Sequence, residues 1–403
     1  MPWPIRILLY TAPIAFILTG FVCLRLRQSL LTLWPDFPSW MLQLLRWIPL
    51  GMLLLPGVVI YQYYSGGIQR IFLLQDKQNI LDVVLNYPYW LAFISAVELF
   101  PYLLLLAIAS LIIKKTGLPT VPYVKGIAVI QLVLIVTIFL YVGFRTARDT
   151  FSVRFREHQI TLKQLPPQLD GMTILLLADI QIDRYTSARK LTPVLPEIQK
   201  RSPQLVLFAG DLITYRTRDA REGIRLLCQF PKKIPRVACM GDHDFWFAPR
   251  SIPKGLRACG WHFLNDAHHI FRWKGARILV TGVTNIYSRP IPRKAARTLF
   301  RAAPAADLKI LLVHQPSESL IELARKFGYH LVVAGHTHGG QILFRPFGIP
   351  LTPTQYENRF YSGAYQLGSL HVVVTNGIGL TFAPVRYQAP AEISIIKLQT
   401  QSD

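Results

Sequence analysis

Acidic residues and cysteines are scarce in this 403-residue chain, which has 22 Asp and Glu against 44 Lys and Arg and only four cysteines. Charged residues make up 16% of the chain and hydrophobic residues 51%, a balance that excludes an intrinsically disordered protein. The cysteines form no CxxC pair, so neither a disulfide framework nor a zinc knuckle is indicated. We expect Cys228, Cys239 and Cys259 to be buried free thiols in a reducing compartment.

The few charges are unevenly distributed. Residues 1–144 hold nine Lys or Arg and four acids, and the rest of the chain holds 35 and 18. Four apolar runs approach or exceed the ~20 residues that a spanning helix needs; they cover residues 5–24, 47–64, 89–113 and 124–144. The sequence therefore predicts a transmembrane helical anchor over 1–144, a basic linker and lead-in over 145–170 and a folded domain over 171–403. A purely soluble protein is excluded.

The distribution of basic residues hardly favours either orientation of the anchor. Seven basic residues flank the spans on the side of the two termini, and six flank them on the opposite side. The expected free thiols and the basic domain favour the cytoplasm for residues 171–403. Glu98 is the one acidic residue inside a predicted span. Either a functional role or a hydrogen bond to a neighbouring helix would explain it.

Beyond residue 170 the pattern changes to short apolar runs typical of strands, and helix-length segments separate the earlier ones. The expected strands are 173–178, 205–209, 237–240, 277–283, 308–313, 331–334, 371–375 and 393–398. The expected helices are 191–201, 220–230 and 318–327. Strands that alternate with helices early and follow one another late indicate an α/β domain with mixed sheets.

An acid or a histidine ends five of these strands. The residues are Asp179, Asp211, Asp242 with His243 and Asp244, His314, and His336 with His338. Because ligands bind at the carboxyl ends of strands in open α/β sheets, these side chains should share one rim. So many carboxylates and imidazoles would repel one another without cations. The sequence therefore predicts a two-metal site.

These ordered blocks resemble the calcineurin-like metallophosphoesterase superfamily, and most of all its membrane-associated bacterial branch, the YkuE/YaeI-like phosphoesterases. The resemblance covers residues ~150–400. It rests on the lead-in at 165–171 (LPPQLDG), the block at 335–342 (GHTHGGQI) and the tail at 376–398. It implies a four-layer α/β/β/α sandwich preceded by an all-α bundle of about four transmembrane helices in a bacterial inner membrane.

The resemblance also implies roles for single residues. The expected metal ligands are Asp179, Gln181, Asp211, Asp242, His314, His336 and His338. Of these, Asp211 would bridge two metals. His243 would approach the leaving-group oxygen, with Asp244 orienting it. Two divalent ions would lower the pKa of a bridging water, and His243 would protonate the departing oxygen.

Two positions depart from the family's motifs. Gln181 stands where a histidine is usual, and Asp242 stands where an asparagine is usual. Both changes make the site richer in oxygen, which favours Mn²⁺, then Mg²⁺, over Zn²⁺ or Fe²⁺. The alternative for Gln181 is a lost first-metal site. Asp183 is then either a substitute ligand or a solvated loop acid.

The expected function is a membrane-anchored dinuclear-metal phosphoesterase that cleaves a phosphoester or pyrophosphate bond. Its partners would be the lipid bilayer and a phosphorylated lipid or nucleotide-lipid, for example a UDP-diacylglucosamine-type lipid A precursor or a phospholipid headgroup. A nucleic-acid partner is not expected, because aromatic stacking platforms are not evident. The stretch 245–247 (FWF) is either core or an apolar lip. The alternative function is a degenerate, non-catalytic domain acting as a membrane scaffold or sensor.

Overall fold

The structure, a computed structural model, describes residues 3–115, 120–163 and 165–400. Its contacts divide the chain into two compact units. The helical unit comprises Met1–Arg148 together with two later segments, Phe344–Leu351 and Phe382–Tyr387. The sheet unit comprises Asp149–Leu343, Thr352–Thr381 and Gln388–Asp403. Each unit is described by itself.

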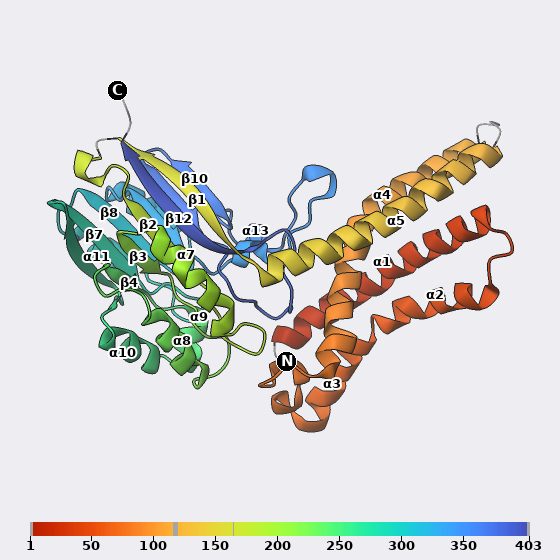
Figure 1. The fold of residues 1–403 in the computed structure, drawn as a ribbon, viewed down its shortest axis with the longest axis horizontal. Helices are drawn as coiled ribbons and strands as arrows, with labels where there is room; N and C mark the ends of the chain where they lie inside the picture. The colour runs from red at the N-terminus through yellow and green to blue at the C-terminus, as the bar shows by residue number, and fades with distance from the viewer. Residues whose placement is uncertain (1–2, 116–119, 164, 401–403) are drawn as a thin grey trace. The chain divides into compact units, whose positions relative to one another are not determined.

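The helices of the first unit are long and apolar (Figure 1). They are α1 (Trp3–Leu33), α2 (Ser39–Gly51), α3 (Leu54–Gly66), α4 (Tyr87–Lys115) and α5 (Thr120–Phe151), whose last residues enter the sheet unit. Four segments are long and apolar enough to cross a membrane: Ile5–Leu33, Ser39–Gly66, Asp82–Lys115 and Val121–Phe151. Each contains one of the predicted apolar runs, so the prediction of four candidate spanning helices is confirmed. Glu98 is buried within α4.

Two segments from the C-terminal half of the sequence belong to the helical unit. Phe344 lies 6.4 Å from Phe93 between ring centroids. Phe347 contacts Tyr102 in the same way at 4.9 Å. These contacts explain why segments from within the predicted domain of residues 171–403 group with the helices. Hydrophobic patterning along the sequence gave no sign of this exchange.

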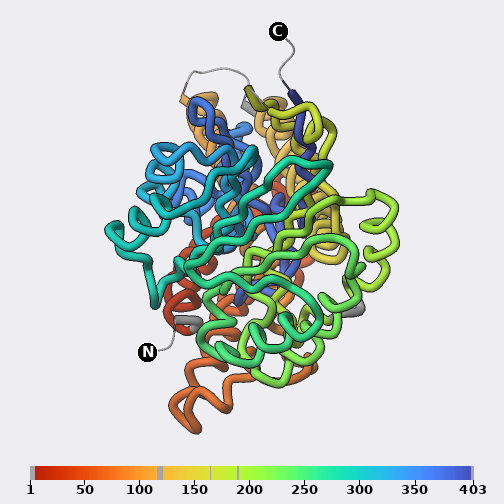
Figure 2. The backbone as a smooth tube through the Cα atoms, turned by 90° about the vertical axis from the view of Figure 1, so that its left-hand side faces the viewer, coloured from red at the N-terminus to blue at the C-terminus, as the bar shows by residue number. Residues whose placement is uncertain are grey.

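The sheet unit contains two six-stranded sheets (Figures 1 and 2). The first has the order β1-β12-β2-β3-β4-β5 and the second β10-β11-β9-β8-β7-β6. The strands are β1 (Val153–Leu162), β2 (Thr173–Leu177), β3 (Leu205–Phe208), β4 (Arg236–Ala238), β5 (His262–Phe263), β6 (Ala267–Trp273), β7 (Ala276–Val283), β8 (Leu308–Val313), β9 (Leu331–Ala334), β10 (Gly363–Leu367), β11 (Leu370–Val374) and β12 (Ala391–Thr400). All eight predicted strands are present and the sheets are mixed, as expected for the α/β class. The expected linker over 145–170 differs, because it contains β1, which pairs in parallel with β12.

Side-chain alternation along the strands builds four layers. Ile174 and Leu176 of β2 join the core between the sheets, and Leu175 and Leu177 face the helices. The helices over the first sheet are α7 (Leu195–Lys200), α8 (Asp219–Leu227) and α10 (Ser251–Ala258); those over the second are α11 (Arg293–Arg301) and α12 (Glu318–Lys326). The expected α/β/β/α order is present. Shorter helices are α6 (Ala188–Leu191), α9 (Asp242–Phe247) and α13 (Thr354–Glu357).

The expectation of three free thiols in this unit is wrong for two of them. Cys228 and Cys259 form a disulfide with their Cα atoms 5.7 Å apart. Each cysteine directly follows a helix, α8 and α10, so the bond ties together two helices of one layer. Cys239 is a buried free thiol, as predicted. Spacing alone missed the pair because the two residues meet only when both helices cover the first sheet.

Candidate metal centre

The predicted site residues lie at the ends of parallel strands in two sheets. Asp179, Asp211 and Asp242 follow the neighbouring strands β2, β3 and β4 of the first sheet. His314 and His336 follow the neighbouring strands β8 and β9 of the second. Carboxylates from one sheet therefore meet imidazoles from the other, because both rims carry the carboxyl ends of their strands.

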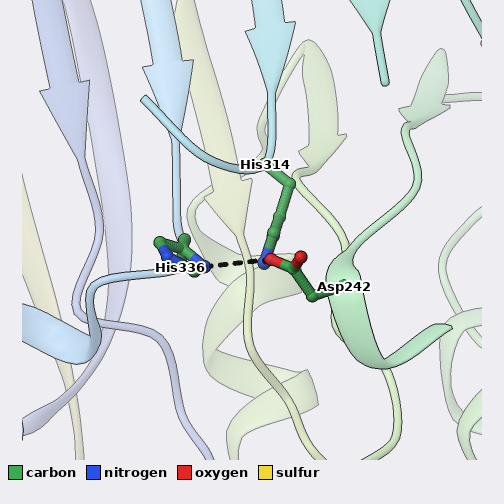
Figure 3. Close-up of side chains that lie close together, drawn as sticks. All are labelled: Asp242, His314 and His336. Atoms are coloured by element: carbon green, nitrogen blue, oxygen red, sulfur yellow. Dashed lines mark ion pairs between the residues drawn. The ribbon is translucent and has the colours of Figure 1, made fainter. Parts of the chain in front are cut away.

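Two overlapping groups have the spacing of metal ligands. Asp179, Asp211 and His314 form an inner triad, in which every residue is buried and the ligand atoms lie within 4.8 Å of one another. Asp242, His314 and His336 form an outer triad with the same spacing, and His336 is only partly buried. The Nε2 atom of the shared His314 lies 3.4 Å from Oδ2 of both Asp211 and Asp242. Figure 3 shows His314 and His336 directed toward the Asp242 carboxylate.

Each of the three carboxylates is held by the backbone through one oxygen. The backbone N–H donors are His336 to Asp179 (2.8 Å), Tyr287 to Asp242 (2.7 Å) and His243 to Asp211 (2.9 Å). The second oxygen of each carboxylate is directed at an imidazole nitrogen of a triad or of His338. One oxygen therefore fixes the side chain, and the other is directed into the site; in Asp179 and Asp242 this second oxygen has no hydrogen-bond partner.

Several of the inward atoms are buried without a hydrogen-bond partner. They include Oδ1 of Asp179, Oδ2 of Asp242 and Nε2 of His314. Nδ1 of His314 lies 2.7 Å from the carbonyl oxygen of Ala209, which places the proton on Nδ1 and the lone pair on Nε2. Buried polar atoms without partners are costly, and divalent cations between these atoms would satisfy them. The donor set of carboxylate oxygens and imidazole nitrogens fits such cations.

The electrostatics of the site depend on the same contacts. Burial raises the pKa of Asp179 to about 7. Burial acts in the same direction on Asp242, but hydrogen bonds with His314 and His336 outweigh it and hold the pKa of that carboxyl below its usual range. Burial alone would lower the pKa of His336, and its contact with Asp242 raises it to about 9. Protons are thus retained at this cluster where no cation is bound, and binding of a cation would release them.

The backbone that carries these side chains is unusual. Asp179, Asp211, His336 and His338 have φ angles of 48°, 61°, 73° and 51°, in the left-handed region that non-glycine residues seldom adopt. Such conformations persist where surrounding contacts enforce them, typically at functional sites. Gly335 permits the turn after β9, since a Cβ there would collide with the Asp179 carboxylate.

Gln181 and His338 both lie at the edge of the inner triad. Nε2 of Gln181 donates to Oδ2 of Asp211 at 3.3 Å, and Nε2 of His338 lies 3.6 Å from Oδ1 of Asp179. The Thr381 hydroxyl joins the two, donating to Oε1 of Gln181 at 3.0 Å and lying 2.8 Å from Nε2 of His338. The oxygen predicted to face a metal is therefore engaged by Thr381. A ligand role for Gln181 stays a prediction.

His243 and Asp244 are close together but do different work. Nδ1 of His243 contacts the carbonyl oxygen of Thr214. The carboxylate of Asp244 accepts hydrogen bonds from the backbone N–H groups of Asp211 at 2.9 Å and Leu212 at 2.8 Å. Asp244 was predicted to orient the imidazole of His243, but in these contacts Thr214 orients it. Asp244 instead fixes the loop that carries Asp211.

The aromatic stretch after His243 divides between the two expected roles. Phe245 packs against the core. Trp246 and Phe247 are 43% and 37% exposed, and the Trp246 ring lies 5.1 Å from the His243 ring. Two exposed aromatic side chains therefore border the residue predicted to meet the leaving group.

Three residues of the site were missed by sequence reasoning. Tyr287 contacts Asp242 through its backbone, Thr381 contacts His338, and Glu357 lies 3.6 Å from His336 between Oε1 and Nε2. Tyr287 and Glu357 end no apolar run of the kind that revealed the other residues. Thr381 lies in the tail at 376–398 that carried the resemblance, but nothing in its spacing marked it.

The predicted alternatives for Asp183 are replaced by a third. Its Oδ1 accepts hydrogen bonds from the backbone N–H groups of Tyr185 at 2.7 Å and Thr186 at 2.8 Å. Its Oδ2 accepts from the Thr214 hydroxyl at 3.2 Å. These contacts make Asp183 an organiser of the loop after β2.

A cavity of about 300 Å³ borders the outer triad. Tyr287, whose N–H binds Asp242, and Gln315, which follows His314, both line it. Apolar side chains such as Ile291 and Leu320 cover much of its wall. Arg293 is the charged residue among those that line it. The cavity thus offers apolar contact and one positive charge next to the candidate metal ligands.

Comparison with known proteins supports the same assignment. Residues 172–340 match the model of the calcineurin-like phosphoesterase family. The chain is 28% identical over 270 residues to the uncharacterized metallophosphoesterase YkuE of Bacillus subtilis, covering 64% of this chain and 90% of that protein. It is 23% identical over 232 residues to phosphodiesterase YaeI of Escherichia coli, covering 56% and 81%.

A transmembrane relative shows a similar match. The transmembrane protein with metallophosphoesterase domain of Danio rerio is 27% identical over 255 residues, covering 60% of this chain and 56% of that protein. The matched segment of this chain holds all three carboxylates and all three imidazoles at the ends of β2, β3, β4, β8 and β9. Residues 172–340 therefore form a calcineurin-like metallophosphoesterase domain.

Proposed function

We propose that the protein is a membrane-anchored, two-metal phosphoesterase that cleaves a phosphoester or pyrophosphate bond in a lipid-linked substrate. The observation that carries the proposal is the set of buried, unpartnered ligand atoms on Asp179, Asp242 and His314. A purely structural core has no reason to face such atoms toward one another, because each costs free energy unless a partner is bound. The acid-rich donor set favours Mn²⁺, with Mg²⁺ next.

The residues divide the chemistry between them. Two divalent ions at this centre would supply Lewis-acid activation and neutralise charge on the phosphoryl oxygens. His243 is held through Nδ1 by the Thr214 carbonyl, so that in its imidazolium form the second N–H, at Nε2, would be the one to protonate the departing oxygen. General acid catalysis of this kind contributes ~10²–10⁴-fold. Asp244 keeps the backbone of Asp211 in place during the reaction.

A lipid-linked substrate is supported by three features. Four candidate spans would keep the chain in a membrane. Trp246 and Phe247 expose apolar surface beside His243. The region beyond residue 144 holds 35 basic against 18 acidic residues, and each Lys or Arg near anionic lipid contributes ~1 kcal/mol. A phosphorylated lipid or a nucleotide-lipid combines the anionic and apolar parts that these features would meet, and nucleic acid lacks the apolar part.

The disulfide changes the proposed location of the domain. The cytoplasmic expectation rested partly on free thiols, and Cys228 and Cys259 are bonded. Because disulfides persist in oxidising compartments, we place the phosphoesterase domain on the extracytoplasmic side of a bacterial inner membrane. Fusions of alkaline phosphatase and of green fluorescent protein to the C-terminus test this. A fluorescent green fluorescent protein fusion together with an inactive alkaline phosphatase fusion would show that the domain lies in the cytoplasm.

A non-catalytic scaffold or sensor is the second candidate. The specific observation in its favour is that Oε1 of Gln181, the atom expected to face a metal, accepts a hydrogen bond from the Thr381 hydroxyl. The retained His243, with exposed aromatic residues around it, favours an enzyme. A scaffold would bind metal without turning over any phosphoester.

The deciding experiment uses the full chain purified in detergent and stripped of metal. Hydrolysis of bis-p-nitrophenyl phosphate is measured with Mn²⁺, Mg²⁺ or Zn²⁺ for wild type, His243→Ala and the exposed-histidine control His262→Ala. We expect Mn²⁺ to restore turnover in wild type and the control, and His243→Ala to lose ~10²–10⁴-fold. A wild type that binds metal but turns over neither this substrate nor lipid phosphates in mixed micelles would establish the scaffold instead.

A further inference from the structure

The two ring nitrogens of His336 face two different carboxylates. Nδ1 lies 3.2 Å from Oδ2 of Asp242, inside the outer triad, as Figure 3 shows. Nε2 lies 3.6 Å from Oε1 of Glu357, outside the triad. A neutral imidazole has its proton on one nitrogen and a lone pair on the other, so the partner of one nitrogen decides what the other can bind.

We propose that Glu357 is a positioning residue, which keeps the proton on Nε2 of His336 and thereby presents the Nδ1 lone pair to a cation at the outer triad. Metal-binding histidines commonly donate their second N–H to a carboxylate, which fixes both the tautomer and the ring orientation, and the 3.6 Å ion-pair contact places the Glu357 carboxylate beside that nitrogen. The inference rests on the proposed function, because it names a support for the same metal centre.

Tyr287 connects Glu357 to the opposite side of the triad. Its hydroxyl donates a hydrogen bond to Oε1 of Glu357, and its backbone N–H donates to Oδ1 of Asp242 at 2.7 Å. Its ring also contacts the His336 ring edge-on, with centroids 4.9 Å apart. Asp242, Tyr287, Glu357 and His336 therefore close a ring of contacts around the outer triad. This ring of contacts holds Asp242 and His336, the two members of the outer triad other than His314.

The position of Glu357 argues against a role in stability. It is the last residue of α13, and its side chain is 42% exposed. Contacts this open to water are worth ~0–1 kcal/mol. The side chain of Gln315 approaches the same Oε1 at 3.5 Å, so three side chains converge on one partly exposed carboxylate. Three side chains that meet at one carboxylate without stabilising the fold are expected where that carboxylate supports a binding site.

The test measures metal affinity as well as turnover. Full-length wild type, Glu357→Gln, Tyr287→Phe and a control are compared by Mn²⁺ equilibrium dialysis. The control is Glu318→Gln, which removes another surface carboxylate, 56% exposed against 42% for Glu357, that pairs with Arg359. Outer-shell substitutions typically cost 10–100-fold in metal affinity. We expect Glu357→Gln to weaken one of two Mn²⁺ sites ~10-fold or more, Tyr287→Phe to weaken the same site less, and Glu318→Gln to change neither.

Two further readouts separate positioning from folding. The midpoint of thermal unfolding should stay unchanged in metal-free Glu357→Gln, and saturating Mn²⁺ should restore most of its turnover. Wild-type affinity at both Mn²⁺ sites in Glu357→Gln would overturn this inference alone. A wild type that binds two Mn²⁺ without hydrolysing any phosphoester would overturn the proposed function alone. A wild type that binds no Mn²⁺ would overturn both.

Discussion

The two sheets contribute unlike halves of the candidate metal centre. The first sheet supplies the carboxylates Asp179, Asp211 and Asp242, each fixed by a backbone N–H. The second sheet supplies His314, His336 and His338, which are oriented by a backbone carbonyl or by side chains such as Glu357 and Thr381. The carboxylate half is therefore positioned by the backbone, and much of the imidazole half is oriented by side chains.

This division follows from the chemistry of the two ligand types. A carboxylate carries its charge in any orientation, so a single hydrogen bond is enough to place it. An imidazole must also have its proton on the correct nitrogen, which needs a second partner. Substitutions in the first sheet should therefore remove metal outright, and those around the second should change affinity or specificity.

The largest expected effect comes from removing one ligand from each sheet and comparing the two variants. Asp211→Asn removes the negative charge between Gln181 and His314, while its amide oxygen can still accept the hydrogen bond from the backbone N–H of His243. Loss of an outer-shell partner alone costs ~10–100-fold, so loss of this ligand should lower kcat/KM by about 10³-fold. His336→Asn should lose one Mn²⁺, whereas Asp211→Asn should lose both. Metal content after gel filtration, measured by mass spectrometry, checks the difference.

The control for this pair is His262→Asn on the short strand β5, which should keep both metals and wild-type turnover. Equal metal loss in Asp211→Asn and His336→Asn would contradict the proposed difference between the two sheets. Thermal unfolding of the metal-free variants shows whether either substitution acts by disrupting the fold.

The next effect concerns stability, and it involves only the first sheet's helices. The Cys228–Cys259 disulfide closes a segment with a separation of 31 residues. Such bonds stabilise by ~2–4 kcal/mol. The free energy of unfolding of the double variant Cys228→Ser, Cys259→Ser, measured by denaturant titration, should be lower by that amount. Its metal content should be unchanged. A reductant should lower the stability of wild type and leave the double variant unaffected; an equal response in both would show that the bond does not form.

Much of the fold could be predicted because burial is written in the sequence. The eight strongly apolar strands were expected with nearly their observed bounds. The strands β1, β5, β6 and β10 were not expected, because β5 has only two residues and few side chains of the other three are buried, so none of them forms a long apolar run. The bond between Cys228 and Cys259 and the grouping of Phe344–Leu351 with the helices depend on tertiary contacts that leave no local signal.

The candidate site was predictable for a different reason. Strand ends deliver Asp179, Asp211 and His314 to one rim, so an apolar run followed by an acid or histidine is informative. Glu357 and Tyr287 follow no such run, and their role depends on how loops fold over the rim. The partner expected for His243 was Asp244, its neighbour in sequence. In the structure the partner is the carbonyl oxygen of Thr214. The sequence could not indicate it, because every residue has a backbone carbonyl.

A smaller effect should come from the cavity beside the second sheet. Arg293 is the charged residue lining it. Arg293→Ala should raise KM about 10-fold for a substrate whose leaving group carries its own anionic group, since a charged hydrogen bond is worth ~1.5–3 kcal/mol. Turnover of bis-p-nitrophenyl phosphate should not change. Arg297→Ala, one turn further along α11, is the matched control, and an equal rise in KM there would remove the cavity from consideration.

The smallest effect distinguishes the edge of the first sheet from the metal centre. His158 of β1 is buried, its Nε2 has no hydrogen-bond partner, and burial with nearby Arg156 lowers its pKa from 6.5 to about 4. The folded protein disfavours the protonated ring, so stability is complete above pH 6.5 and is lost as the pH falls toward 4. We expect this difference in pKa to cost the folded state about 1 kcal/mol between pH 6.5 and pH 4.5.

The comparison uses unfolding free energies at pH 7.5 and pH 4.5 for metal-free wild type, His158→Leu and Gln159→Leu, an exposed neighbour on the same strand. His158→Leu should lose about 1 kcal/mol less than wild type between the two pH values, and Gln159→Leu should behave as wild type does. If His158→Leu shows the full wild-type loss, the acid sensitivity originates elsewhere. The raised pKa values of Asp179 and His336 would not be its source, because both groups bind protons more tightly in the folded state and therefore favour it as the pH falls.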